Sequence, residues 1–91
     1  MAKIVENEKG FRVIEVSRTE LVEKLGYQGA VGICDFCNRS SSVGYLICVL
    51  NSWYCPDCYK RYISNAKRYA EDVDYEFAVF NRYVKLLGIN Q

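Results

Sequence analysis

The apolar positions of the chain follow an extended pattern first and a helical pattern later. Residues 11–16 (FRVIEV) are rich in β-branched and aromatic side chains at near-alternating positions, which predicts a strand. The next four residues match a capping box, in which the Ser17 hydroxyl accepts from the Glu20 backbone N–H and the Glu20 carboxylate returns to Ser17. A short helix is therefore predicted to follow and to end at Gly26, before a connector over 27–33.

A second extended pattern predicts a β-hairpin in the middle of the chain. The apolar run 43–50 is followed by the turn residues Asn51-Ser52, and Trp53-Tyr54 resumes an extended segment. Pro56 suits the first turn of a helix, where its missing N–H costs nothing. The sequence thus predicts a hairpin that leads directly into a helix.

Two amphipathic helices are predicted after the hairpin. In the first, roughly residues 56–71, a basic stripe of Lys60, Arg61, Lys67 and Arg68 opposes an apolar face that includes Tyr59, Tyr62 and Tyr69. Asp72 and Asp74 break and recap the chain, and the second helix ends near Gly88. Its apolar stripe comprises Phe77, Val79, Phe80, Tyr83, Val84, Leu86 and Leu87. This stripe is wider than a small core readily covers, which favours docking to a second copy of the chain or to another protein.

Length and composition predict one domain over 1–91, with an N-terminal strand and short helix in 1–30, a metal-binding core in 31–71 and a C-terminal helix in 72–91. Domains of this size are commonly reinforced by a metal, disulfides or self-association. An odd count of five cysteines cannot pair completely. The chain also has no apolar stretch of signal-peptide or membrane-span length, so a reducing cytoplasmic location is expected.

The absence of histidine excludes most hydrolase chemistry. Without histidine the chain lacks the commonest general base, the usual partner of a nucleophilic serine or cysteine, and any mixed Cys/His zinc site. A net charge of +1 leaves no segment basic enough to require nucleic acid. We therefore expect a protein that is not an enzyme and has no small-molecule substrate.

Four of the cysteines have the spacing of a metal site. Cys34 and Cys37 form one C-x-x-C pair, Cys55 and Cys58 form another, and 17 residues separate the pairs. This lies within the window of about 15–20 residues that is typical of four-cysteine zinc sites. A closed shell of four thiolates has no open coordination position, so the zinc would stabilise the fold and catalyse nothing. The alternatives are four unrelated buried cysteines, or a redox dithiol at Cys55 and Cys58, which needs a thioredoxin-like βαβ setting.

A tight turn that carries Cys34 and Cys37 (the knuckle), a hairpin, and a helix that carries the second cysteine pair follow one another in the chain. This order resembles the treble-clef class of zinc fingers over residues 31–71. The fold class expected from this resemblance is α+β, a small zinc-stabilised treble-clef-like domain. The cysteine spacing is similar to that of GATA-type and DksA/TraR-type fingers, which would imply contact with DNA or with RNA polymerase. The loop 38–43 lacks the Trp-Arg-Arg stretch of a GATA finger, and no coiled coil precedes Cys34 as the DksA type requires. Short four-cysteine proteins of this kind resemble those common on phages and mobile elements.

Several basic, aromatic and apolar residues are candidates for binding nucleic acid or another protein. Arg39, in the knuckle loop, and the basic stripe are the candidates for nucleic-acid contact, although a solvated helix face is the simpler interpretation. The candidates for a protein interface are Trp53, Tyr54, Val79, Tyr83 and Leu86, although a residue such as Trp53 at the end of a hairpin is more usually a packing residue. Cys48, the fifth cysteine, lies in the most apolar strand and is expected to be an inert buried thiol, with ligand exchange or redox sensing as the alternatives.

Three functions follow from these features. The favoured hypothesis is a non-enzymatic zinc-binding module that acts as an adaptor or regulator through a protein partner or as a homodimer. The second hypothesis is a nucleic-acid-binding zinc finger that uses the basic face of the helix. The third is a thiol oxidoreductase acting through Cys55 and Cys58. No membrane association is expected.

Overall fold

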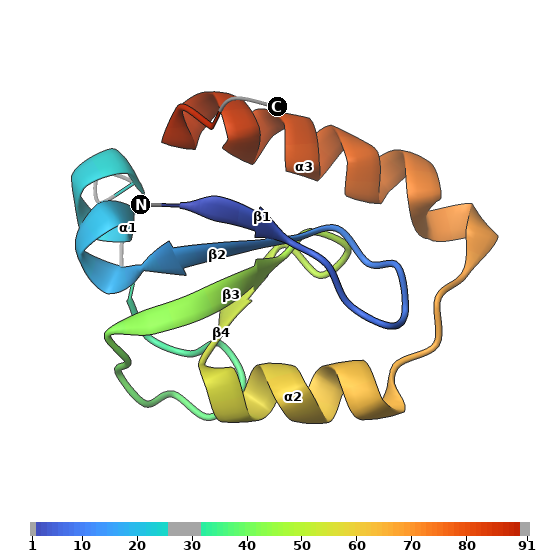
Figure 1. Ribbon diagram of the computed structural model, residues 1–91, viewed down its shortest axis with the longest axis horizontal. Coiled ribbons are helices and arrows are strands. Elements are labelled where there is room, and N and C mark those ends of the chain that lie inside the picture. The colour runs from blue at the N-terminus through green and yellow to red at the C-terminus, as the bar shows by residue number, and fades with distance from the viewer. Residues whose placement is uncertain (1, 26–31, 90–91) are drawn as a thin grey trace.

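One antiparallel sheet of four strands lies between helix α2 on one face and helix α3 on the other (Figure 1). The structure is a computed structural model that describes residues 2–25 and 32–89. The strands are β1 (Lys3–Val5), β2 (Val13–Ser17), β3 (Val43–Ile47) and β4 (Ser52–Tyr54), in the spatial order β1-β2-β3-β4. The α-helices are α1 (Arg18–Leu25), α2 (Pro56–Asn65) and α3 (Val73–Leu87), and the short 3-10 helix η2 (Ala70–Asp72) directly precedes α3. The α+β class expected from the sequence is confirmed.

The register of the strands places two different sets of side chains on the two faces of the sheet. Ile14 pairs with Leu46, which pairs with Trp53, and these three side chains belong to the core beneath α3. Val13 pairs with Ile47, and both belong to the core beneath α2. Because helices cover both faces, β2 carries consecutive buried residues, which explains why its apolar pattern does not alternate cleanly.

The larger core lies between the sheet and α3. Its buried members are Ala2, Ile14, Val16, Leu21, Leu46, Cys48, Trp53, Val79, Phe80, Val84 and Leu87. The sheet thus covers the apolar stripe of the last helix, which removes the reason for expecting a second copy to cover it. Phe77 departs from the prediction, because it is 46% exposed and lies under the guanidinium of Arg12, whose Cζ is 4.8 Å from the ring centroid.

The smaller core, beneath α2, is rich in aromatic rings. Phe11, Val13, Ile47 and Ile63 are buried there, and the half-buried Tyr45 and Tyr59 stack with their ring centroids 4.2 Å apart. Tyr62 also packs on this core, as predicted. Tyr69 does not, because it is 49% exposed. The tyrosines of α2 itself therefore serve mainly to attach the helix to the sheet.

Helix α2 is shorter than the sequence predicts, and the prediction of a helix to residue 71 is wrong. Ala66 is extended (φ −76°, ψ 149°), and its N–H donates to the Tyr62 carbonyl. The Asn65 amide donates to the Arg61 carbonyl at 2.9 Å, a side-chain bond that competes with continuation of the helix. The chain must also cross from the α2 face to the α3 face, and residues 66–69 provide this crossing (Figure 1).

Several local predictions are confirmed. The Ser17 hydroxyl accepts from the Glu20 N–H at 3.1 Å at the start of α1, and α2 begins at Pro56. The hairpin joins β3 to β4, and α3 ends at Gly88 in the left-handed region (φ 68°). Strand β1 was not predicted, because three residues are too few to show a period. The predicted end of α1 at Gly26 and most of the connector lie outside the described residues.

Candidate metal centre

The four predicted ligand cysteines converge on one point between the knuckle and the start of α2. The sulfur atoms of Cys34, Cys37, Cys55 and Cys58 all lie within 4.8 Å of one another. Cys34 and Cys58 are buried, Cys37 and Cys55 are half-buried, and all four are free thiols rather than disulfides. One metal ion can therefore contact all four sulfur atoms. Sequence spacing alone had predicted this cluster.

The first cysteine pair is held in a tight turn. The Cys34 carbonyl accepts from the Asn38 N–H at 2.9 Å, and the Cys34 N–H donates to the Arg39 carbonyl at 2.8 Å. Asn38 has a positive φ of 63°, a conformation that asparagine adopts more readily than most residues. These bonds curl the chain so that Cys34 and Cys37 face the same point.

Asp35 fastens this turn to the hairpin. Its N–H donates to the Trp53 carbonyl at 2.9 Å, and its carboxylate Oδ2 accepts from the Trp53 N–H at 2.9 Å. Both bonds use backbone groups on the free edge of β4, which would otherwise face water. Since Cys55 follows β4 directly, Asp35 sets the position of the first cysteine pair relative to the second. Sequence reasoning missed this role, although a carboxylate inside the C-x-x-C motif was a signal for it.

The second cysteine pair is positioned by the start of α2. Cys55 precedes the helix with extended backbone (φ −66°, ψ 163°), and its carbonyl accepts from the Tyr59 N–H at 2.9 Å. Pro56 occupies the first helical position, so Cys58 falls in the first turn. The two thiols therefore project from one end of the helix toward the knuckle.

The thiols of this cluster differ in acidity. Burial opposes ionisation of Cys34, but hydrogen bonds from the backbone of Cys37, Cys55 and Phe36 outweigh it and lower the pKa of Cys34 to about 6. Burial, hydrogen bonds with the other thiols and the charge of Cys34 raise the pKa of Cys58 to about 12. Without a metal the cluster thus favours one thiolate beside a protonated Cys58. Binding of a metal ion would therefore release protons.

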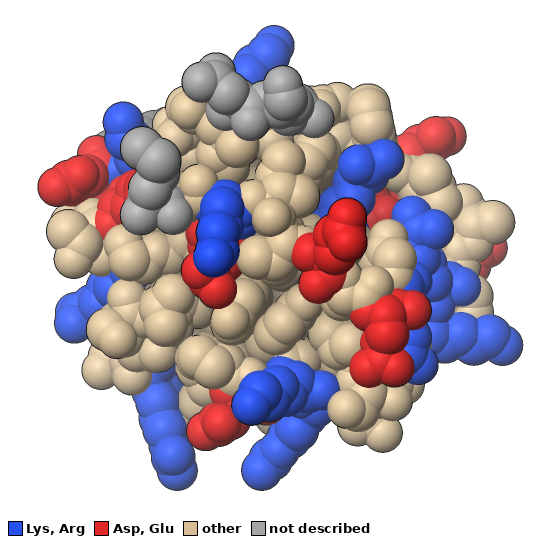
Figure 2. Space-filling model, viewed as in Figure 1, with Lys and Arg blue, Asp and Glu red and all other residues tan. Residues whose placement is uncertain are grey.

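The predicted basic stripe does not form. Lys60 and Arg61 are exposed on α2, whereas Lys67 lies beyond its end with Nζ 5.8 Å from the centroid of the Tyr69 ring. Arg68 forms an ion pair with the buried carboxylate of Glu76 at 2.9 Å. In Figure 2, basic and acidic side chains are interspersed over the face shown. Arg39 is exposed and shares with Arg61 the lining of a cavity of about 420 Å³ beside Cys37, Cys55 and Cys58.

The predicted interface residues divide into two groups. Trp53 and Val79 lie in the core rather than on the surface, and the Trp53 indole N–H donates to the Val16 carbonyl at 3.2 Å. Leu86 and Tyr83 are half-buried against the same core, with the Tyr83 hydroxyl donating to Asn51 Oδ1 at 2.7 Å. Tyr54 is half-buried beside the metal centre, where its ring meets that of Phe36.

Two residues of consequence were not predicted. Glu76 is 1% exposed and joins α3 to the crossing segment, and no local pattern distinguishes it from the exposed acidic residues around it. Phe36 is 64% exposed although it is a large apolar residue. Its place between two candidate ligand cysteines was the available signal.

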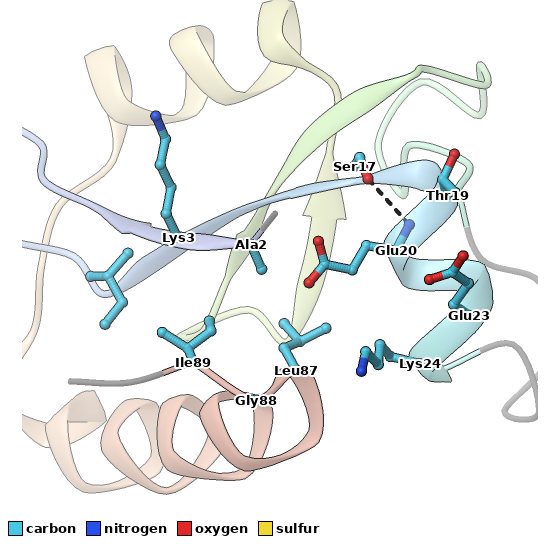
Figure 3. A pocket seen from close by; sticks show the side chains of 11 residues that line it. Ala2, Lys3, Ser17, Thr19, Glu20, Glu23, Lys24, Leu87, Gly88 and Ile89 are labelled. Atoms are coloured by element: carbon cyan, nitrogen blue, oxygen red, sulfur yellow. Dashed lines mark hydrogen bonds between the residues drawn. The ribbon is translucent and has the colours of Figure 1, made fainter.

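Another cavity has none of the four clustered cysteines in its lining. It is a groove of about 800 Å³ between α1, β1 and the end of α3 (Figure 3). Its apolar floor is formed by Ala2, Leu87 and Ile89, and Glu20, Glu23 and Lys24 line its α1 side. None of the predicted site residues lines this groove.

Among residues 2–25 and 32–89, no helix is long and apolar enough to cross a membrane. Comparison with family models, with curated proteins and with solved structures gives no match.

Proposed function

We propose that this chain is a zinc-stabilised module, not an enzyme, that binds another protein as an adaptor or regulator through the surface beside its four cysteines. The observation that carries the proposal is Phe36, a large apolar side chain that is 64% exposed on a turn immobilised by the cluster. The Phe36 ring adjoins that of Tyr54, with centroids 5.8 Å apart, so the apolar surface here is continuous, and continuous exposed apolar surface is typical of protein interaction sites.

Zinc is the metal that best suits the donor set. Four thiolates in one place are soft ligands, which select zinc or an iron–sulfur cluster. A tetrahedron with Zn–S bonds of about 2.3 Å has sulfur atoms about 3.8 Å apart, and the Cys37 and Cys55 sulfur atoms are separated by 3.8 Å. Iron–sulfur clusters hold their cysteine sulfur atoms farther apart, since several metal and sulfide ions lie between them. The four cysteines would fill the zinc coordination shell and leave no position for a substrate.

The treble-clef assignment belongs to the same proposal. A ligand-bearing turn, the hairpin β3–β4 and a helix whose first turn carries the second ligand pair follow one another in the order expected of that class. In such an arrangement the metal joins the turn to the helix, so that Phe36 and the exposed side of α2 are held as one surface.

The experiment has two parts. Native mass spectrometry of the purified chain, with and without a strong chelator, should show one zinc ion per chain and report any self-association. A photo-reactive phenylalanine analogue is then placed at position 36 or, as a control, at Tyr75, which is 53% exposed on α3. Cross-links to a protein from position 36 alone support the proposal. Cross-links to nucleic acid, equal cross-linking from both positions, or a chain without metal would overturn it.

A further inference from the structure

We propose that the cavity between Phe36 and α2 is a pocket for one apolar side chain of a partner peptide, and that Arg61 at its mouth pairs with a carboxylate of the same peptide. The inference rests on the proposed function and adds to it the chemistry of the partner. It concerns a cavity of about 300 Å³ lined by Phe36, Tyr54, Cys58, Arg61, Tyr62 and Asn65.

The walls of this pocket are three aromatic rings from three different elements. The Phe36 and Tyr54 rings meet at 5.8 Å with planes inclined by 55°, and the Tyr54 and Tyr62 rings meet edge to face at 6.1 Å. Phe36 comes from the metal turn, Tyr54 from β4 and Tyr62 from α2. The rings therefore form an angled apolar wall whose shape depends on the metal centre. Covering it would remove apolar surface from water, which favours binding.

One side of α2 supplies the remaining lining. Cys58, Arg61, Tyr62 and Asn65 are spaced three and four residues apart and so share one face of the helix. The adjacent side of α2 packs on the sheet through Tyr59 and Ile63, and Tyr62, between the two sides, contacts the same core. At about 300 Å³, the pocket is at the lower limit of typical ligand sites, which span about 300–1,000 Å³. A single side chain is therefore a better match than a larger molecule.

The charges at the mouth of the pocket favour an acidic partner. Arg61 is exposed and, among the described residues, its guanidinium forms no ion pair. It lines both this pocket and the neighbouring cavity that contains Arg39, and Lys60 is exposed next to it on α2. Of these three cations, Arg61 alone lines the pocket. Two exposed carboxylates adjoin lining residues in the chain, Asp57 next to Cys58 and Asp35 next to Phe36, and that of Asp35 already accepts from the Trp53 N–H. A guanidinium with free donors binds a carboxylate in a bidentate manner.

A peptide fits this site better than a nucleic-acid strand. Four thiolates outweigh the charge of a divalent ion, so the metal cluster that adjoins both cavities is net negative. A run of phosphates would have to pass this cluster and Asp57, whereas one carboxylate needs to reach only Arg61. The inclined rings also offer no series of parallel faces on which successive bases could stack.

The test uses the full zinc-loaded chain and a library of random 12-residue peptides displayed on phage. Enriched peptides should share an apolar residue with an Asp or Glu at a fixed distance from it. The most enriched peptide is then synthesised and its affinity for the chain is measured. Phe36→Ala should weaken this affinity by at least about tenfold, as expected for a central apolar anchor. Arg61→Ala should weaken it by about 5- to 30-fold, and replacing the peptide carboxylate by its amide should have the same effect, without adding to that of Arg61→Ala.

Matched variants separate binding from folding. Tyr75→Ala and Lys85→Ala remove an exposed aromatic ring and an exposed cation from α3, on the other face of the sheet, and should leave binding unchanged. Native mass spectrometry should find one zinc ion in every variant compared. A labelled 12-nucleotide strand of thymidines, called dT12 below, serves as the nucleic-acid probe, and it should neither bind the site nor displace the peptide.

The remaining outcomes overturn the inference in different ways. Enriched peptides without an acidic residue, or peptides insensitive to Arg61→Ala, would refute the charge recognition and leave the proposed function standing. Peptide binding that is insensitive to Phe36→Ala would refute the pocket alone, and so would a failure to enrich any peptide while position 36 still cross-links to a protein. Displacement of the peptide by dT12 would refute the choice of a peptide, and failure of both selection and cross-linking would refute the proposed function as well.

Discussion

The carboxylate of Glu76, on the buried side of α3, forms an ion pair at 2.9 Å with Arg68, in the segment that crosses from one face of the sheet to the other. The second oxygen of the same carboxylate accepts from the Arg12 N–H at 3.0 Å. A single buried group thus links the last helix to the crossing segment and to the residue that precedes β2. The same contact pairs the guanidinium of Arg68, which is still partly exposed, with a carboxylate of the protein itself, whereas the sequence predicted that this group would contact nucleic acid.

Replacement of Glu76 should destabilise the fold. Glu76→Ala leaves the Arg12 N–H without its acceptor, removes the partner of Arg68 and opens a small cavity, so we expect a loss of about 2–4 kcal/mol in the free energy of unfolding. Arg68→Met should cost less, about 1–3 kcal/mol, because the Arg68 side chain is 37% exposed. Urea unfolding measures both values. Glu71→Ala, in the exposed turn η2, is the control and should change stability by less than about 0.5 kcal/mol; an equal loss there would contradict the buried role of Glu76.

Removal of one of the four clustered cysteines should abolish metal binding, whereas removal of Cys48, which lies outside the cluster, should not. Cys34→Ser takes away one of the four clustered sulfur atoms, and we expect loss of the bound metal and unfolding at least of the turn and of α2, since structural zinc contributes directly to folding. Cys48→Ala serves as the matched control because Cys48 is equally buried but belongs to the core beneath α3. Native mass spectrometry reports the metal, and circular dichroism reports the helix content. A folded, metal-bound Cys34→Ser protein would refute the site.

Stability should fall at alkaline pH partly because of Cys48. Burial and the nearby charge of Glu76 raise the pKa of Cys48 to about 12 from an ordinary value of 9.0, against a smaller lowering by Arg12. Between these two values the unfolded chain loses the thiol proton and the folded chain keeps it, so this contribution is complete below pH 9 and is lost as pH rises toward 12. We expect Cys48→Ala to show a shallower decline between pH 9 and 11 in urea-unfolding experiments. Parallel curves for the two proteins would show that the thiol ionises as easily in the folded state.

Gly44 should tolerate no side chain. A Cβ at this position would clash with the indole ring of Trp53 and would lie 2.7 Å from the Tyr54 carbonyl oxygen. Gly44→Ala is therefore expected to cost about 1–3 kcal/mol, as overpacking typically does, and to change the fluorescence of Trp53, the one tryptophan of the chain. Ser42→Ala, at an exposed position just before β3, should leave both properties unchanged. An unaltered fluorescence spectrum in Gly44→Ala would mean that the hairpin shifts to make room.

Local chemistry accounts for the predictions that are confirmed. The capping serine at 17, the helix start at Pro56 and the helix end at Gly88 each depend on bonds within a few residues. So does the hairpin turn, which occupies residues 48–51 instead of Asn51-Ser52, because Ser52 already pairs with Ile47 in β4. The cysteine cluster belongs with them, because two C-x-x-C pairs separated by a hairpin are brought together by the hairpin itself. What governs these features is backbone geometry over short distances, and the sequence displays it directly.

The features that were missed or misplaced depend on contacts between distant parts of the chain. Whether Lys67 and Arg68 extend a helical stripe was decided by the need to cross the sheet after Asn65, and whether Trp53 is an anchor or a core residue was decided by the packing of α3. The aromatic pocket likewise exists only where the metal turn, β4 and α2 meet. The sequence by itself therefore determined the local elements and the cluster of four cysteines that could hold a metal ion, whose causes are close along the chain. Only the tertiary structure decided which side chains are buried, paired or left exposed, because burial is set by neighbours that lie far away in sequence.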